Sequence, residues 1–172
     1  MGNLVLMDLD VGKIHFICNL VSVKIEVPVS LNLLFSIANG AALAGWIVLL
    51  ATPFLPRIAN IVSGYAIPLA LSAIYTGIAI AYFGGAEGGF DTLQNVALLF
   101  TQPEMVLLGW VHFLAFDLFI GAWEARTARA EAIPFLLVIP CLVFTFLLGP
   151  VGLLMFLALR AIRRAMARRA VQ

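Results

Sequence analysis

The sequence predicts an all-α polytopic membrane protein: a bundle of four transmembrane helices, with a short interfacial helix between the second and the third. Two observations carry this prediction. Of the 172 residues, 63% are hydrophobic and only 11% are charged, whereas soluble domains average about 45–50% and about 25%. The apolar residues also form four long runs without the alternation of a lipid-facing β-barrel, and about 20 helical residues cross a bilayer.

The same composition excludes several classes of protein. A chain of this size cannot hide so much apolar surface from water, which argues against a soluble monomer, a disordered chain, a secreted disulfide scaffold and a nucleic-acid binder. The two cysteines are Cys18 and Cys141. Cys141 lies in an apolar run, where a free buried thiol is expected rather than a disulfide.

The first two spans are expected at about 31–55 and about 61–83. Pro53 closes the first, and Pro68 lies inside the second. A glycine-rich turn follows, and residues 91–100 then form the short helix, with Asp91 as its N-cap. Its apolar side suits the membrane interface.

The third and fourth spans are expected at about 105–123 and about 133–159. In the fourth, Pro134 stands at a helix-start position, while Pro140 and Pro150 fall inside the run, as neighbouring helices in a membrane permit. The four-helix domain is therefore assigned to residues 29–160.

Two terminal segments flank this domain. Residues 1–28 form an extension of uncertain structure, in which Val21, Val23, Ile25 and Val27 alternate with polar residues, a strand-like period of two. It is either an interfacial extension or the product of a start codon assigned too far upstream. It is not a signal peptide, because no basic region precedes an apolar core. Residues 161–172 form a basic tail.

Basic residues set the expected orientation. With four spans, both termini lie on one side, which carries seven basic residues (Lys13, Lys24 and the five arginines from Arg160 to Arg169) against three on the other side. Both termini are therefore expected to be cytoplasmic.

The candidate catalytic residues lie in the stretch W-V-H-F-L-A-F-D-L-F-I-G-A-W-E-A-R, residues 110–126. Asp117 lies roughly 18 Å into its span at 1.5 Å per residue. Because an acid there costs at least about 2–3 kcal/mol, it must face protein, water or a ligand. His112 is the only histidine within a predicted span, and Glu124 lies at the far end of the same span.

Helical geometry relates these three residues to one another. Asp117 and Glu124 are seven apart and share a face at a height difference of about 10 Å, whereas His112 and Asp117 are about 140° apart around the helix. Asp117 and His112 can flank one elongated ligand without touching each other. Asp117 and Glu124 cannot hold one ion at that height, and a lone histidine argues against bis-histidine haem. No metal or cofactor is therefore expected.

Candidate substrate-binding residues are polar or aromatic positions within the spans. They are Asn32, Ser36, Asn39, Tyr75, Trp110, Phe113, Trp123 and Thr145.

Structural roles compete with the binding and catalytic ones. The polar stripe on the first span, formed by Asn32, Ser36 and Asn39, can form interhelical hydrogen bonds. Tyr75 can serve in packing. Glu124 can form an ion pair with Arg126 or Arg57 at the interface. Gly149-Pro150-Val151-Gly152 is typical of a kink with close helix contact.

The 110–126 stretch and P-C-L-V-F-T-F-L-L-G-P-V-G-L-L from Pro140 resemble the neoxanthin-synthase-like (abscisic-acid-deficient-four-like) family of membrane proteins. The resemblance covers roughly residues 31–160. It implies a four-helix membrane protein that acts on carotenoids, because plant members are linked to conversion of violaxanthin to the allenic neoxanthin, an isomerisation without redox change. Lacking a plastid transit peptide and ending in an arginine tail, the chain is expected to be a bacterial member in the inner membrane.

These observations predict a membrane-embedded isomerase that acts on a carotenoid or related isoprenoid by acid–base chemistry, of the epoxide-to-allene or cis–trans type. A neutral Asp117 would protonate the epoxide oxygen, and His112 or Glu124 would take a carbon-bound proton. The alternatives are a non-catalytic carotenoid- or lipid-binding membrane protein and a small proton-relay or transport subunit. The expected partners are an apolar polyene ligand and membrane lipid, without nucleic acid, and a homodimer is left open.

Overall fold

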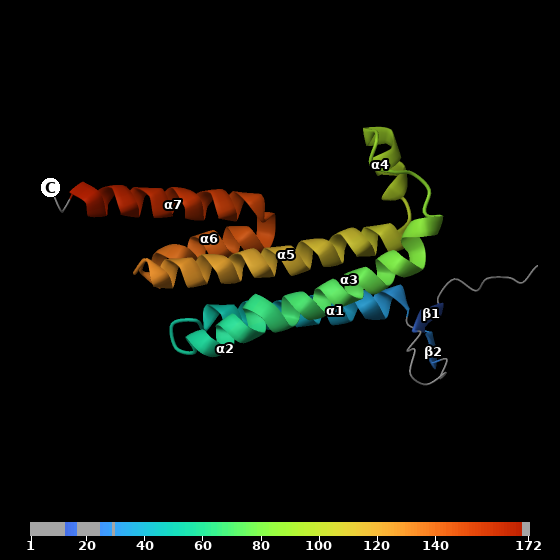
Figure 1. The fold of residues 1–172 in the computed structure, drawn as a ribbon, viewed down its shortest axis with the longest axis horizontal. Coiled ribbons are helices and arrows are strands. Elements are labelled where there is room, and N and C mark those ends of the chain that lie inside the picture. Colours follow the sequence, from blue (N-terminus) through green and yellow to red (C-terminus); the bar gives the residue numbers. More distant parts are fainter. Residues whose placement is uncertain (1–12, 17–24, 29, 170–172) are drawn as a thin grey trace, which may run out of the picture.

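The computed structural model describes residues 13–16, 25–28 and 30–169. Strands β1 (Lys13–Phe16) and β2 (Ile25–Pro28) pair antiparallel within the extension, and the rest of that extension lies outside the described residues. All the later elements are helical (Figure 1). They are α1 (Leu31–Leu50), α2 (Pro56–Ile61), the π-helix η1 (Val62–Ala66), α3 (Ile67–Tyr82), the 3-10 helix η2 (Phe83–Gly85), α4 (Leu93–Leu99), α5 (Pro103–Ala130), α6 (Phe135–Leu148) and α7 (Pro150–Arg169).

Among the described residues, three helical stretches are long and apolar enough to cross a membrane: α1, the continuous run of α2, η1, α3 and η2 from Pro56 to Gly85, and α5. Their outward side chains include large hydrophobic residues such as Ile80, which is 82% exposed, and Leu69, which is 67% exposed. Water would make such a surface costly, whereas lipid solvates it. These helices therefore agree with the predicted membrane class.

The first span ends, and the second span begins, about five residues earlier than predicted. α1 ends at Leu50, and the hydroxyl of Thr52 donates a hydrogen bond to the carbonyl of Leu49 just beyond that end. The second span begins at Pro56, where the missing N–H of proline removes no helical bond. The wider turn of η1 precedes Pro68, whose ring would otherwise press on the carbonyl of Gly64.

The third span, α5, is longer than the predicted 105–123 at both ends. Its last turns stay helical where they pack against α6, and Glu124 and Ala128 are buried there. α5 also packs against α1 and α3 and is the central element of the bundle (Figure 1).

The predicted single span at 133–159 is wrong, because the chain reverses at Gly149. α6 has 14 residues, which is about 21 Å of helix and less than the roughly 30 Å of a hydrocarbon core. Gly149 has a φ of +22°, which L side chains rarely adopt, and Pro150 starts the next helix. α7 then runs back along α6, so the two form a helical hairpin beside α5 (Figure 1).

The short helix α4 is present, although its cap differs from the prediction. The hydroxyl of Thr92, rather than Asp91, accepts the backbone N–H of Asn95 at 3.1 Å. Asp91 instead accepts a hydrogen bond from the side-chain amide of Asn95 at 2.9 Å. Phe100, just after α4, lies directly over Gly109 of α5: a Cβ atom there would be 2.8 Å from the Phe100 ring.

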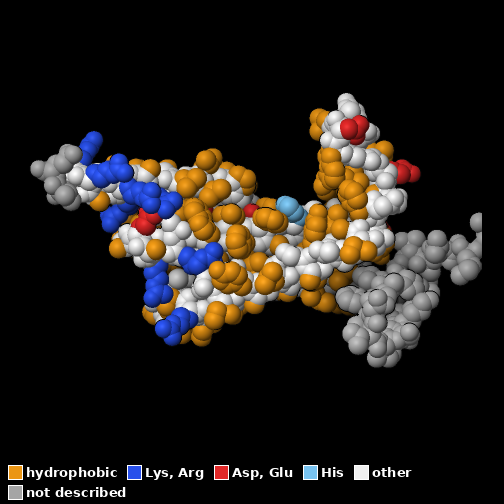
Figure 2. Space-filling model, viewed as in Figure 1, with side chains coloured by type: hydrophobic (Ala, Val, Ile, Leu, Met, Phe, Trp, Pro, Cys, Tyr) orange, Lys and Arg blue, Asp and Glu red, His pale blue; other side chains and the backbone are white. Residues whose placement is uncertain are grey.

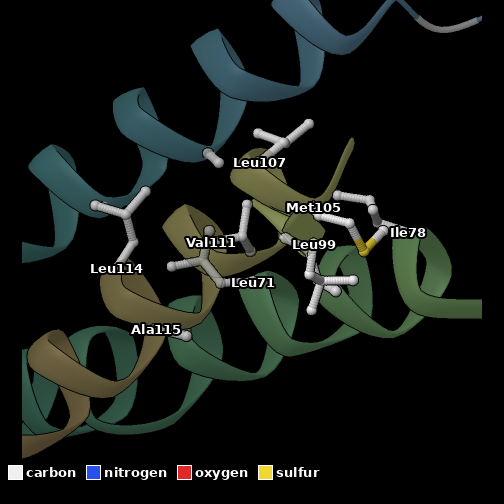
Figure 3. Close-up of a cluster of buried hydrophobic side chains, with 11 residues drawn as sticks. Leu71, Ile78, Leu99, Met105, Leu107, Val111, Leu114 and Ala115 are labelled. Atoms are coloured by element: carbon white, nitrogen blue, oxygen red, sulfur yellow. The ribbon is translucent and has the colours of Figure 1, made fainter. Parts of the chain in front are cut away.

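Two clusters of buried side chains hold the helices together. The first joins α3, α4 and α5 through residues such as Leu71, Leu99 and Val111 (Figure 3). The second joins α1, α5 and the hairpin and includes Trp46, which lies so close to Gly121 that a Cβ there would be 2.6 Å from its ring. Cys141, in this second cluster, is buried and free, as expected, whereas Cys18 lies outside the described residues.

The arginines gather at one end of the molecule, where α2 begins and where α5 and α7 end (Figure 2). The described acids Glu87, Asp91 and Glu104 lie in the segment around α4, at the opposite end (Figure 1). Because the hairpin returns the chain, the end of α7 lies at the opposite end of the bundle from the start of α1. The start of α1 and the end of α7 therefore do not share one side in this fold, as four full spans would require.

Candidate functional site

Glu124 faces the α6–α7 hairpin and is completely buried. The hydroxyl of Thr145 on α6 donates to its carboxylate, at 3.0 Å from Oε1 and 3.1 Å from Oε2. Arg126 bonds Asn60 rather than Glu124. The sequence-based alternative of an ion pair with Arg126 or Arg57 at the interface is therefore wrong, and Glu124 ties the hairpin to α5.

Thr145 is positioned by the close approach of α6 and α7. A Cβ atom on Gly152 would overlap the backbone nitrogen and the hydroxyl of Thr145. The second glycine of the Gly149–Gly152 motif is thus needed for helix contact, and the first is needed for the reversal.

Asp117 lies two turns before Glu124 on the same helix, beside the hairpin turn. A Cβ atom on Gly149 would be 2.6 Å from its Oδ1. Its Oδ2 is buried and has no hydrogen-bond partner within residues 30–169 or the two strands. The predicted shared face is therefore present, but the two acids differ: the carboxyl group of Glu124 is hydrogen-bonded within the fold, whereas one oxygen of Asp117 is not.

His112 lies on another side of α5 and is exposed. Its ring stacks on Phe116 with centroids 4.6 Å apart, and the ring of Tyr75 on α3 lies at 5.8 Å. His112 and Tyr75 line a cavity of about 530 Å³ between α3, α4 and α5, together with aromatic side chains from the α3–α4 connection and the end of α4. These aromatic residues are Phe83, Phe90 and Phe100.

A second cavity, of about 240 Å³, lies further along the same α3–α5 seam. Tyr65, Ser72, Phe116 and Phe119 are among its lining residues. Phe116 therefore lines one cavity and stacks on the histidine that lines the other. Together the two cavities form a predominantly apolar and aromatic track along α3 and α5, suited to a long apolar molecule.

Asp117 does not line either cavity, so the structure does not bring it and His112 into one closed pocket. The two residues flank the exposed face of α5 that carries Phe116, as their 140° separation predicted. On this side the molecule is hollowed between α4 and the α6–α7 hairpin, which both stand out from the bundle (Figure 2).

The polar stripe of α1 lies apart from this track. The indole N–H of Trp110 donates to Asn39 Oδ1 at 3.1 Å, which is an interhelical bond. Asn32 lines a separate cavity of about 460 Å³ between α1 and α5. The hydroxyl of Ser36 bonds the carbonyl of Asn32 within the same helix.

The last two aromatic candidates pack against other aromatic side chains of the fold. Phe113 stacks on Trp110 at 5.6 Å, and Trp123 meets Phe156 of α7 edge to face at 5.5 Å. Within the described ranges, histidine, cysteine and acidic side chains form no group of three suited to a metal ion.

Comparison with known proteins decides the family. A family model described as ABA DEFICIENT 4-like matches residues 33–156. The chain belongs to the ABA DEFICIENT 4-like family. No curated protein and no solved structure gives a significant match.

Membership of the ABA DEFICIENT 4-like family agrees with the resemblance found in the sequence. It suggests a membrane protein of the carotenoid and abscisic acid pathway. The two stretches that carried the resemblance, residues 110–126 and 140–154, fall within the matched region. The fold packs them together as α5 against the hairpin.

The sequence did not single out Phe83, Phe90 and Phe100 of this ABA DEFICIENT 4-like protein. Phe83 is the last residue of the predicted second span, whereas Phe90 and Phe100 lie beyond it, so no spacing within one helix groups them. Only the tertiary structure brings them to His112. Gly149 was noticed, but as a kink; the signal for a reversal was the Gly-Pro pair, which supplies both a left-handed position and a helix start.

Proposed function

We propose that this ABA DEFICIENT 4-like protein is a membrane-embedded isomerase of a carotenoid or related isoprenoid and that it works by acid–base chemistry. The observation that carries the proposal is the carboxyl group of Asp117, whose Oδ2 is buried without a described hydrogen-bond partner. A carboxyl group in an apolar span that the fold does not use for structure suits a functional role. The family supports the carotenoid link.

The proposed substrate lies along the exposed face of α5, between α4 and the hairpin. The aromatic cavity beside His112 holds one end of the molecule, and its chain crosses the exposed ring of Phe116 towards Asp117. The rings of Tyr75, Phe100 and Phe116 offer flat apolar contacts to a polyene. Asn32 lines a different cavity, and Ser36 and Asn39 lie on the same helix away from the track, so the three are not part of this proposal.

For an epoxide substrate, Asp117 in its neutral form gives a proton to the epoxide oxygen while the carbon–oxygen bond breaks and its electron pair stays on oxygen. His112 accepts a proton from carbon, and the electron pair of that carbon–hydrogen bond forms the new double bond. One proton enters the substrate and one leaves, so the product is an isomer. Glu124, bonded to Thr145, acts as a positioning residue for the hairpin against which Asp117 lies.

Asp117→Asn tests the role of the acid. The full-length protein is produced in a host that accumulates the epoxy-carotenoid violaxanthin, and the pigments are separated by chromatography before and after incubation. Loss of a general acid lowers conversion by about 10²–10⁴-fold, whereas Glu104→Gln, at the far end of α5, leaves conversion unchanged. Full conversion by Asp117→Asn would remove Asp117 from the mechanism.

The non-catalytic alternative rests on the stacking of His112 against Phe116 and Tyr75, which suits binding of a flat pigment without any reaction. It predicts that carotenoid copurifies with the protein in a fixed ratio and is recovered unchanged after incubation. It also predicts that Asp117→Asn keeps its pigment. The proton-relay or transport alternative and the homodimer remain predictions.

We also propose that the arginine-rich end faces the cytoplasm. Arginines flanking spans favour the cytoplasmic side, and the fold collects them all at the end where α7 finishes (Figure 2). The start of α1 then faces the opposite side. The bacterial inner membrane remains the expectation from the sequence.

A further inference from the structure

A cavity of about 440 Å³ opens at the arginine-rich end, between the α1–α2 turn and the last turns of α5. Three arginines line it: Arg57 from α2, and Arg126 and Arg129 from α5. Thr52 and Asn60 add uncharged polar groups, and no acidic side chain is among the lining residues. The side chains that line the cavity therefore carry a formal charge of +3, with no carboxylate among them to neutralise it.

The acid that follows α5, Glu131, is bound to arginines outside the cavity. Glu131 accepts hydrogen bonds from Arg160, at 2.7 Å from Nε, and from Arg164, at 3.1 Å from Nε. In the part of the chain that the structure describes, these are the ion pairs found. The three cavity arginines therefore keep their charge available for a ligand.

Arg126 is held in place before any ligand arrives. Its Nη1 donates to Asn60 Oδ1 at 3.1 Å, and its guanidinium carbon lies 5.6 Å from the ring centre of Tyr65 and 5.9 Å from that of Phe119. Gly64 leaves room for it, since a Cβ atom there would overlap Nη1. A pre-ordered guanidinium loses less conformational entropy when it binds.

The cavity floor is apolar. Leu49, Ala122 and Ala125 line it beneath the arginines, and all three are buried. Because α1 ends at Leu50 and α5 at Ala130, the cavity lies where the spans leave the hydrocarbon core. The planar fork of arginine matches phosphate oxygens, and basic pockets between transmembrane helices bind anionic lipid headgroups.

We propose that this cavity is a binding site for a phosphate group, held by Arg57, Arg126 and Arg129. The group can belong to the headgroup of an anionic lipid or to a free phosphate ester, and the apolar floor favours the lipid. This site adjoins the end of the track along α3 and α5, because Arg126 contacts Tyr65 and Phe119, but the proposal does not depend on the proposed isomerase activity.

The test measures lipid binding to the full-length protein in neutral detergent by native mass spectrometry, with phosphatidylglycerol and phosphatidylcholine of the same acyl chains. We expect tighter binding of phosphatidylglycerol, weakened about ten- to thirtyfold by the double variant Arg57→Gln/Arg129→Gln, at about 1 kcal/mol per arginine. Both residues are exposed, so the variant is expected to fold. The matched control, Arg163→Gln/Arg168→Gln, removes two exposed arginines of α7 and keeps wild-type binding.

Competition with excess inorganic phosphate distinguishes the two sources. If phosphate displaces the lipid and its own binding needs Arg57 and Arg129, the ligand is a free phosphate; if it does not compete, the ligand is a lipid. Arg126→Lys keeps the charge but loses the fork, so it should weaken binding of either ligand. The proposal is overturned if the two double variants lose equal affinity, or if neither phosphatidylglycerol nor phosphate binding depends on the cavity arginines.

Discussion

Replacing Gly149 by alanine tests both the reversal between α6 and α7 and the position of Asp117. Gly149 has a φ of +22°, and left-handed backbone costs an L residue about 1–2 kcal/mol. The new Cβ would be 2.6 Å from Asp117 Oδ1 and 3.2 Å from its Cγ, closer than packed atoms come. Displacing that carboxyl group adds about 1–3 kcal/mol, the usual cost of overpacking. The expected loss of unfolding free energy is therefore about 2–5 kcal/mol.

The assay is unfolding of the purified protein in detergent, followed by circular dichroism. Gly40→Ala is the matched control, because a Cβ at Gly40 meets nothing within 4 Å and alanine favours a helix interior by about 1 kcal/mol. The double variant Gly149→Ala/Asp117→Ala should recover the steric part of the loss.

Whether Gly149→Ala lowers or raises the free energy of unfolding distinguishes the hairpin from a single straight span. If residues 133–159 formed one straight span, Gly149 would lie inside a helix, and alanine would stabilise the protein by about 1 kcal/mol. A variant Gly149→Ala that is as stable as Gly40→Ala would refute the reversal and the contact with Asp117.

Three further predictions follow from the hairpin and its contacts. Thr145→Val should lower the free energy of unfolding in denaturant by about 1–2 kcal/mol, because it leaves the buried carboxyl group of Glu124 without its partner. The control Thr76→Val changes an exposed hydroxyl that is bonded within its own helix and should cost a few tenths of a kcal/mol at most. Equal losses in the two variants would contradict the buried pair. Hydrogen bonds from the α7 arginines lower the pKa of Glu131 from 4.5 to about 2, so this pairing stabilises the fold above pH 4.5 and is lost as pH falls towards 2; thermal midpoints measured across that range should fall more in wild type than in Glu131→Gln, and parallel curves would argue against the pairing. Cysteines introduced at Gln94 and at Ala167, in a chain without native cysteines, should react with an impermeant maleimide from opposite sides of oriented vesicles. If both react from the same side, the topology with four full spans is correct instead.

The membrane class and three of the spans could be predicted from the sequence because hydropathy and run length are local properties. Their ends could not, because contacts decided them: α5 continues to Ala130 where it packs against α6, and Glu124 and Ala128 are buried there. The polar residues after Trp123 suggested a loop, and only the neighbouring helix shows that they are covered.

The candidate site was predicted in part. Asp117, Glu124 and His112 were singled out because ionisable groups in an apolar run are costly, and helical geometry correctly placed the two acids on one face. Their partners came from distant segments: Thr145 lies 21 residues from Glu124, and Tyr75 reaches His112 from another helix. No spacing within a single helix predicts such pairs.

The sequence by itself determined that this protein belongs in a membrane, which family it belongs to, and which stretch carries its ionisable groups. The tertiary structure alone decided that the fourth apolar run turns back at Gly149, that Glu124 is used in the fold while one oxygen of Asp117 is not, and that the arginines meet at one end around a cavity. The reason is physical: a straight span and a hairpin of the same run have the same composition. What separates them is one left-handed residue and its contact with a side chain 32 positions away along the chain.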